Sequence, residues 1–545
     1  MVIPGPIPDY ADLCRPAQAS RAGWVAPKPL ASPASARRPG AGRATGDEQS
    51  SSPVGFSFRR RSLLSCVAAL SLCSCAPDDI GSGSAMTAPD DLAVGQAITR
   101  AAETPDRDRR PPDPFWWSGY GDPQLDHLVA LLDRQAPGMA LAAARLRRAE
   151  AMNTAAGAVL EPAATLSATT AEERFPNHSV YSPAYAGKGG SEGRIAVDVR
   201  YHLDFWGKRA ETAAAAGARV AAARAEAEDA RLLLRTGLVE AYLRLDAAIR
   251  LRDIAVSGLV RREGLVDLLV IRTSAGLSTD LDAVASREAV TETRDGIVRL
   301  EAEIATCRHR IAALLGLDPA FADTLSRPAL RSPMGDPLPL SSLPASLLGR
   351  RPDVAVRRAE VEAAAHEIGV ARAGFYPDVD LLAFAGPASL GLAHLLRSGS
   401  VAAGVGPAVT LPVFDGGLLR SGLAGRMADF DAAVAAYDEV IATALRQIAD
   451  GVVELRAWQA RKTEAVTAFD HWSRAVALTE ARERQGLSAA GDRLSAETAL
   501  LLSRRRVVEA ETGAAIARVG LIRALGGAFA SRVIDGAHDI GEMKE

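Results

Sequence analysis

The sequence contains few of the residues on which enzymes and metal sites depend. Phe, Trp and Tyr together make up 5% of its 545 residues, and five cysteines occur. No two Cys-x-x-Cys motifs have the spacing of a zinc site, and the eight histidines are scattered without a His-Glu-x-x-His motif. A nucleophile elbow and a phosphate-binding loop are also missing. We therefore expect no enzyme activity, no metal and no bound cofactor.

An excess of charge of one sign is missing as well. Lys and Arg total 63 and Asp and Glu total 66, which gives a formal net charge of −3. Because no basic face stands out, nucleic acid is not an expected partner. The chain is rich in Ala, Leu, Arg and Glu instead, a composition that is typical of long helices. Cys307 lies alone in such a stretch and is expected to be a small buried apolar residue.

No hydrophobic run near the N-terminus is long enough for a membrane helix. Residues 1–53, rich in Pro, Ala, Arg and Gly, are expected to form no core, and translation is expected to start near Val54. Arginines at 59–61 precede an apolar stretch of ten residues, Leu63–Leu72, which is too short to span a bilayer. This order of basic and then apolar residues indicates a signal peptide.

The end of this stretch resembles the lipobox of bacterial lipoproteins. Its residues are Leu-Cys-Ser-Cys, with Leu three positions before Cys75 and the small Ser directly before it. The resemblance implies a lipoprotein signal peptide over 54–74, covalent diacylglycerol or palmitate on Cys75, and a lipidated N-terminal tail over 75–115. Ala76 follows the cysteine, which by the sorting rule for such lipoproteins implies the outer membrane. An ordinary secretory signal that contains cysteine is the alternative.

A short phrase occurs twice in the chain. "AGLSTDLDAV" begins at Ala275 and "QGLSAAGDRL" at Gln485, and in each an Asp lies six residues after the Gly of Gly-Leu-Ser. Other matching residues keep the same spacing of 210, or 215 further upstream: Gly207 with Gly417, Gly316 with Gly526, Pro137 with Pro352, and Pro162 with Pro377. We therefore predict a tandem duplication. Its parts are a first repeat at 116–318, a linker at 319–339, a second repeat at 340–528 and a tail at 529–545.

Each repeat contains an alternating pattern that predicts membrane-length strands. Apolar and polar residues alternate over 195–205 ("IAVDVRYHLDF") and again over 405–413. Weaker runs follow Pro162 and Pro377, and aromatic residues lie near the ends of the runs, as in an interfacial girdle. The Gly-rich "GKGGSEG" at 187–193 is interpreted as the outer loop between the first two strands. A soluble, half-buried sheet is the alternative.

Two proline-free intervals of equal length predict two very long helices. Gly207 to Gly276 and Gly417 to Gly486 each span 69 residues, or roughly 100 Å at 1.5 Å per residue. Shorter helical stretches have the length to stack end to end against them, and Gly276 and Gly486 are expected to form left-handed turns at the far tip. Four strands cannot close a barrel, and open edges are not tolerated in lipid, so several copies are expected to share one barrel.

Taken together, these features resemble the TolC-like outer-membrane efflux proteins, best the lipoprotein branch that serves resistance–nodulation–division pumps. The motifs that carry the resemblance, across 116–528, are "PFWWSGYGDPQLDHLV", "RPDVAVRRAEVEAAAHEIGVARAGFYPDVDL", "GPAVTLPVFDGGLLR" and "ALGGAF". Trp116 and Trp117 of the first motif are expected to be packing anchors. In the last motif, Phe529 stands where the family usually has Trp.

This resemblance implies a mainly α fold with a transmembrane β-barrel. In a homotrimer, each protomer gives four strands to a twelve-stranded barrel, which continues into a long periplasmic α-helical barrel. The implied function is a passive duct that exports small molecules across the outer membrane, with a periplasmic adaptor protein and an inner-membrane pump of the resistance–nodulation–division type as partners. Protein export by a type I secretion system and a coiled-coil lipoprotein without a pore are the alternatives.

The resemblance also implies which residues serve the duct. The residues expected to contact the adaptor are Gly276, Leu277, Ser278, Gly486, Leu487 and Ser488. The residues expected at the periplasmic gate are Asp492, Glu483, Ser495 and Asp282. Glu483 stands where lipoprotein members have an aromatic residue, and Ser495 where another member has Asp. Three copies of Asp492 around one axis would favour cations; for both aspartates a solvated helix surface is the alternative.

Overall fold

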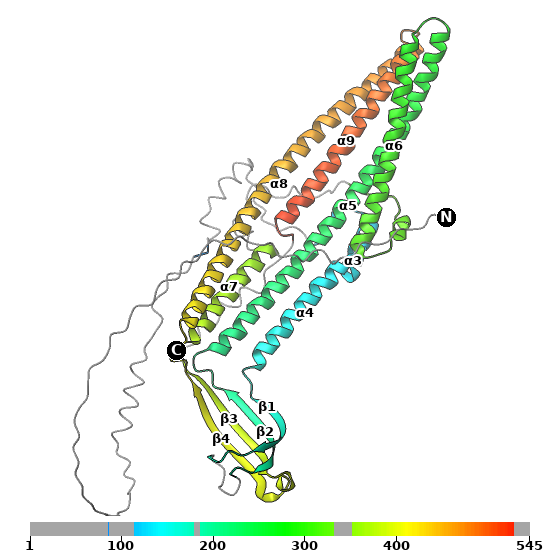
Figure 1. Ribbon diagram of the computed structural model, residues 1–545. Coiled ribbons are helices and arrows are strands. Elements are labelled where there is room, and N and C mark those ends of the chain that lie inside the picture. The colour runs from blue at the N-terminus through cyan, green and yellow to red at the C-terminus, as the bar shows by residue number, and fades with distance from the viewer. Residues whose placement is uncertain (1–84, 87–113, 179–185, 332–350, 528–545) are drawn as a thin grey trace, which may run out of the picture. The chain divides into compact units, whose positions relative to one another are not determined.

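The computed structural model describes residues 85–86, 114–178, 186–331 and 351–527. All of them belong to one of the two units of the chain, Cys75–Glu545, and the other unit is Met1–Ser74. The predicted signal peptide and lipid acceptor Cys75 lie outside the described residues, as do the predicted C-terminal tail and residues 332–339 of the predicted linker. Within the described unit, a small sheet is followed by a wall of long helices (Figure 1).

One antiparallel sheet contains four strands in chain order, β1-β2-β3-β4. The strands are β1 (Ala163–Arg174), β2 (Gly189–His202), β3 (Asp378–Leu390) and β4 (Val401–Thr410). All four predicted runs are therefore strands, two from each half of the chain.

The prediction of a loop over the whole of 187–193 is wrong in part. Gly189–Gly193 are the first residues of β2 and pair with Thr170–Arg174 of β1. Their glycines allow close packing: a Cβ on Gly193 would lie 2.7 Å from the Leu392 side chain. The ends of two predicted strands are also wrong, because β2 stops at His202 and not at Phe205, and β4 stops at Thr410 and not at Val413.

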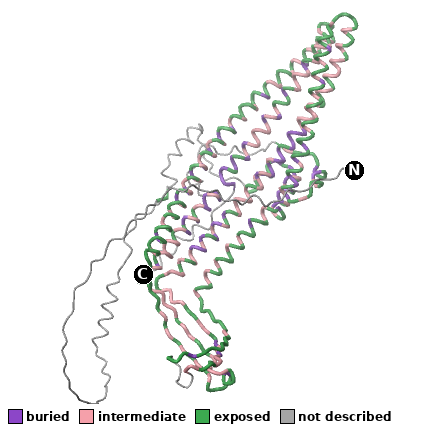
Figure 2. Tube along the Cα trace, in the orientation of Figure 1, coloured by how far each residue is buried: buried purple, intermediate pink, exposed green. Residues whose placement is uncertain are grey.

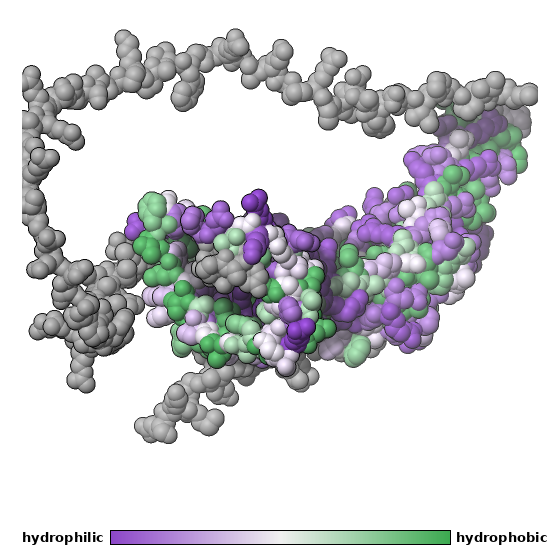
Figure 3. Space-filling model, turned by 60° about the horizontal axis from the view of Figure 1, so that its bottom comes forward, coloured by the Kyte–Doolittle hydropathy of each residue, from purple (hydrophilic) through white to green (hydrophobic). Residues whose placement is uncertain are grey.

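The two faces of the sheet differ in polarity. The register places apolar, solvent-exposed side chains on one face, among them Leu166, Val197, Tyr201, Leu381, Val401, Val405 and Val409. Ser167, Arg194 and Asp198 lie on the other face, where the Asp198 carboxylate accepts hydrogen bonds from the Ser167 hydroxyl and the Arg194 guanidinium. Hydrophobic residues form patches across this end of the molecule in Figure 3. An apolar outer face on strands of this length is typical of a membrane barrel.

Four helices continue the strands in the same lateral order. α4 (Pro137–Ala158) precedes β1, α5 (Lys208–Ser274) follows β2, α7 (Pro352–Ala373) precedes β3, and α8 (Leu418–Arg484) follows β4. α5 packs between α4 and α7, and α7 packs between α5 and α8. α5 and α8 each contain 67 residues, which confirms the two predicted rods.

Further from the sheet, two other helices continue the wall. α6 (Asp280–Leu315) packs on α5, and α9 (Ala490–Ala524) packs on both α8 and α5. Each long helix is therefore matched by two shorter ones, as predicted. None of the described helices combines the length and the apolar character needed to cross a membrane.

A core near the middle of the wall holds the first repeat together. Buried segments gather along α5 near the middle of the wall (Figure 2). Its Leu238, Tyr242 and Leu245 are fully inaccessible and belong to this core. α3 (Pro123–Gln135) and the short helix η3 (Trp116–Tyr120) belong to the same core. The η3 residue Trp117 is 5% exposed and packs edge-on against Trp116, which confirms the predicted packing role. Cys307 of α6 is buried here too, as predicted.

Candidate functional site

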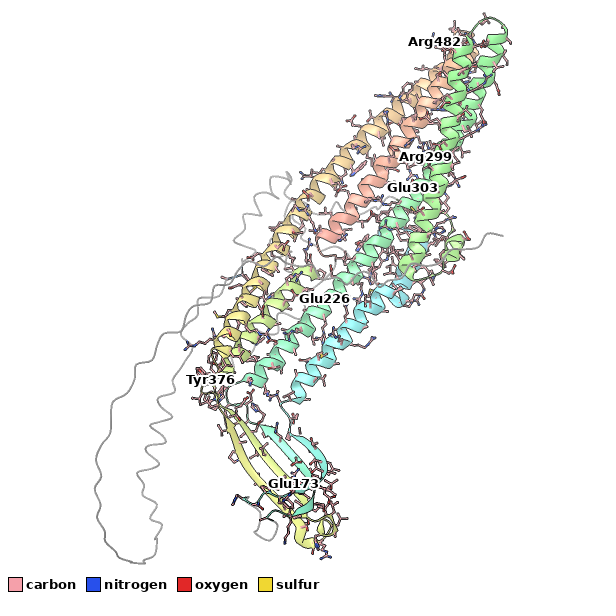
Figure 4. The ribbon with its side chains drawn as sticks, viewed as in Figure 1. Glu173, Glu226, Arg299, Glu303, Tyr376 and Arg482 are labelled. Carbon is pink, nitrogen blue, oxygen red and sulfur yellow. The ribbon has the colours of Figure 1, made fainter. Side chains whose placement is uncertain are left out.

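The Gly-Leu-Ser phrase forms the turn at the far end of both helical hairpins. We call residues 272–282 the first tip and residues 482–492 the second tip. Gly276 and Gly486 both have φ +71°, a left-handed conformation that strains any residue with a Cβ. In each tip the Leu amide donates to the carbonyl oxygen of the Arg five residues earlier, at 2.8 Å in the first tip and 2.9 Å in the second. Figure 4 shows Arg482 at this end of the molecule.

The predicted adaptor residues differ in how free their side chains are. Leu277 is 68% exposed and Leu487 is 64% exposed, so each Gly-Leu-Ser turn presents its leucine to solvent, and the first tip also exposes Leu281. The serine hydroxyls are engaged locally: Ser278 Oγ donates to Asp282 at 3.0 Å and Ser488 Oγ to Asp492 at 3.4 Å. The structure thus makes the leucines, and not the serines, available for a partner.

Asp282 stabilises the first tip by capping its own helix. Its carboxylate accepts hydrogen bonds from the Thr279 hydroxyl at 2.7 Å and the Thr279 amide at 3.1 Å, while the Thr279 hydroxyl caps the Asp282 amide. These two groups form a capping box at the start of α6. The hydrogen bonds from Thr279, followed by that from Ser278, hold the pKa of Asp282 below its usual value.

Asp492 occupies the same position in the second tip with weaker local support. Its carboxylate accepts a hydrogen bond from the Ala489 amide at 3.1 Å, and the carboxylate is exposed. Ala489 stands where the first tip has Thr279, so the reciprocal hydroxyl bond is lost. Ser495, one turn further along α9, is also exposed.

The predicted gate residue Glu483 belongs to a network of charges that links three helices. Arg493 of α9 donates to Glu483 of α8 at 2.7 Å and to Glu497 of α9 at 2.5 Å. Glu497 also forms an ion pair with Arg261 of α5. The hydrogen bonds to Glu497 and Glu483 raise the pKa of Arg493.

Sequence reasoning did not identify Arg493, Glu497 or Arg261. The spacing of Arg493 and Glu497, four residues apart on one helix, is a signal that could have identified that pair. The contacts of Arg493 with α8 and of Glu497 with α5 carry no such signal. Of the four predicted gate residues, Glu483, Asp492 and Ser495 lie in the second hairpin, and Asp282 lies in the first.

Aromatic residues mark the end of the sheet that adjoins the helices. Trp206 and Tyr376 stack with their ring centroids 4.6 Å apart, and the Trp206 indole donates to the Pro377 carbonyl at 3.0 Å. Phe205, which follows β2, is 66% exposed, and Phe414, which follows β4, is 92% exposed, at the same end of the sheet. Figure 4 shows Tyr376 at this junction. The predicted gathering of aromatic residues at one end of the strands is therefore confirmed.

A sheet with one apolar face, continued by a wall of long helices with paired tips, defines a subunit of a TolC-like outer-membrane channel. The model of the family described as "Outer membrane efflux protein" matches residues 128–317 and 343–527. The chain belongs to this family of outer-membrane channel proteins.

Individual relatives agree with this assignment. The chain is 34% identical to the fusaric acid resistance protein FusA of Burkholderia cepacia over 330 residues, 59% of this chain and 61% of that protein. It is 28% identical to the pyoverdine export outer membrane protein OpmQ of Pseudomonas aeruginosa, over 87% of this chain and 98% of that protein. The crystal structure of the outer membrane protein VceC of Vibrio cholerae superposes with a TM-score of 0.69 at 33% identity, covering 77% of this chain and all of that chain.

Proposed function

We propose that three copies of this chain form a passive duct in the outer membrane, through which a tripartite system exports small molecules. A periplasmic adaptor protein would bind the tips, and an inner-membrane pump of the resistance–nodulation–division type would supply the energy. The names of two relatives, which concern fusaric acid resistance and pyoverdine export, support a small-molecule cargo.

The observation that carries this proposal is that both edges of the sheet lack a partner strand among the described residues. Among the described residues, β1 and β4 each pair on one side only. An unpaired backbone polar group in lipid costs several kcal/mol, so a sheet with an exposed apolar face must close its edges. Pairing β4 of one copy with β1 of the next closes them, and three copies give twelve strands.

The helical wall supports the same closure. Its lateral order is α4, α5, α7, α8 near the sheet and α6, α5, α9, α8 further away. One border is therefore formed by α4 and α6, with Met152 and Val298 exposed, and the other by α8, with Val453 and Leu478 exposed. Neighbouring copies would cover these apolar side chains.

Two further parts of the proposal concern the ends of the duct. Acylation of Cys75 would anchor the mature chain in the outer membrane, which is supported by the lipobox-like sequence. At the other end, three copies of Asp492 around the axis would form a cation-favouring constriction. Glu483 would contribute less charge there, because Arg493 already pairs with it.

Native mass spectrometry of the detergent-extracted protein tests the assembly. We expect a trimer whose subunits begin at a diacylglycerol-modified, palmitoylated Cys75. An unlipidated monomer that starts upstream of Cys75 would overturn both the shared barrel and the anchor.

Substitution of the exposed leucines tests the adaptor site. Leu277→Asp and Leu487→Asp are expected to abolish drug resistance in a strain that carries the cognate pump and adaptor, while the trimer persists. Leu396→Asp is a matched control, because Leu396 is 84% exposed but lies in the loop between β3 and β4. Full resistance of both tip variants, or equal loss in the control, would refute the assignment.

A further inference from the structure

A groove on the helical wall is not explained by the duct. It has a volume of about 890 Å³ and is bounded by α5, α8, α9 and the segment 327–331. η3 contributes Tyr120 to its lining. We call it the wall groove. It lies away from both tips and from the sheet.

The wall groove has an excess of positive charge. Its acidic residues are already paired: Asp253 with Arg327 at 2.6 Å, and Glu511 with Arg250 at 2.7 Å. The third acid, Asp246, lies 3.5 Å from the same Arg250. Three further arginines that line the groove have no carboxylate partner within the part of the chain that the structure describes: Arg331, Arg504 and Arg518.

A buried hydroxyl in the same groove also lacks a partner. Tyr120 is 3% exposed, and its hydroxyl has no hydrogen-bond partner among the described residues. Burial raises the pKa of Tyr120 to about 12, although Arg518 opposes the shift, so the hydroxyl is a neutral donor at physiological pH. A buried donor without an acceptor costs about 1–3 kcal/mol, which favours an occupant with acceptor oxygens.

We propose that the carboxy-terminal segment of the same chain, residues 528–545, folds back along α9 and places its carboxylates in the wall groove. This segment follows directly after Gly527, just beyond the end of α9, the helix that contributes Arg504 and Arg518. It carries four acidic residues, Asp535, Asp539, Glu542 and Glu545, against two basic ones, Arg532 and Lys544. Its excess of negative charge complements the three unpaired arginines.

The distances allow this arrangement. Arg518 lies nine residues before Gly527, or about 13 Å along a helix. The eight residues from Gly527 to Asp535 extend to about 27 Å, which is enough to return to Arg518. From Arg518 to Arg504 is about 21 Å of helix, and the seven residues from Asp535 to Glu542 span about 23 Å when extended. Asp535 and Glu542 therefore match the spacing of the two arginines.

Such a strap would have a mechanical effect. It would connect α9 to α5, α8 and the segment 327–331, and so hold the second hairpin against the first. The contact itself requires neither a trimer nor export.

Photo-crosslinking of the full-length chain in detergent tests the contact. A photoreactive residue at Ile534 or Met543 is expected to crosslink to α9 between Arg504 and Arg518, or to residues 327–331. Crosslinks confined to residues 332–350 or to another molecule would overturn the proposal. The absence of any crosslink to the wall groove would overturn it as well.

Charge reversal is the second test of the contact. Arg504→Glu with Arg518→Glu is expected to lower the crosslinking yield about tenfold, as the loss of a charge-assisted hydrogen bond predicts, and Asp535→Arg with Glu542→Arg is expected to restore it. Arg505→Glu is the matched control, because Arg505 pairs with Glu509 and does not line the groove. An equal loss in the control, or no recovery in the charge swap, would refute the contact. Native mass spectrometry of the same samples reports trimer formation separately.

Discussion

The two tips share a backbone and differ in what stabilises it. Both have a glycine at φ +71° and the same hydrogen bond from Leu to Arg. The first tip is stabilised within itself by the capping box of Thr279 and Asp282. The second tip has Ala489 at that position and is stabilised instead by the ion pairs of Arg493 with Glu483 and Glu497.

The turn conformation is common to both repeats, whereas the side-chain interactions that stabilise it differ. The turn requires glycine in both copies because backbone strain acts wherever φ is positive. The capping hydroxyl could be lost in the second tip because ion pairs hold α8 and α9 together there. Through Glu497 the second hairpin is also tied to α5, so its position depends on a neighbouring helix. The first tip is thus the more self-contained of the two.

The largest expected effect is that of Gly276→Ala and Gly486→Ala. Each should destabilise its tip by roughly 1–2 kcal/mol, because both glycines have the same left-handed φ and a Cβ gains no contact within 4 Å. Hydrogen exchange of the tip amides measures the loss. Gly264→Ala, in the interior of α5 with open space around it, should stabilise by about 0.5–1 kcal/mol. Unequal losses of stability at the two tips would contradict the conclusion that both turns require glycine for the same reason.

Exchange of the capping residues is expected to change the stability of the two tips in opposite directions. Thr279→Ala should destabilise the first tip by about 1 kcal/mol, because it removes the capping hydroxyl. Ala489→Thr should stabilise the second tip by up to the same amount. The measurement is again hydrogen exchange, at the first turns of α6 and α9. No gain from Ala489→Thr would mean that the ion pairs already fix this helix end.

Arg493→Ala should affect the second tip alone. It removes two ion pairs between side chains that are about one-third exposed or less, and each pair is worth roughly 0.2–1 kcal/mol. We expect faster exchange at the end of α8 and an unchanged first tip. Arg299→Ala is the control, since Arg299 pairs with Asp295 on the exposed surface of α6 (Figure 4). A similar change in the control would show that loss of any surface charge suffices.

The smallest expected effect is the pH dependence of the first tip. The pKa of Asp282 is lowered in the folded state, so its contribution is present above the unfolded value of about 3.9 and is lost as the pH falls through the lower folded value. Asp282→Asn should therefore weaken the first tip at pH 7 and make no difference once the pH is below both values. A difference that persists in acid would show that the charge of Asp282 is not the cause.

Much of the fold could be predicted because its signals are local or repeated. The lengths of α5 and α8 follow from proline-free intervals between glycines, and the strands from a period of two. The pairing of Gly189–Gly193 with β1 could not be read from composition, because glycines that relieve crowding in a sheet resemble glycines in a loop. The network of Arg493 was missed because two of its contacts join different helices.

By itself the sequence determined the duplication, the length of each rod and the two left-handed turns, because these depend on patterns that are local or repeated along the chain. Only the tertiary structure decided the order of the four strands, the free edges of the sheet, and the ion pair of Arg261 with Glu497. The wall groove likewise exists only where α5, α8, α9 and residues 327–331 meet. Contacts of this kind depend on the register and rotation of whole elements against one another, and packing fixes these only when the whole wall assembles.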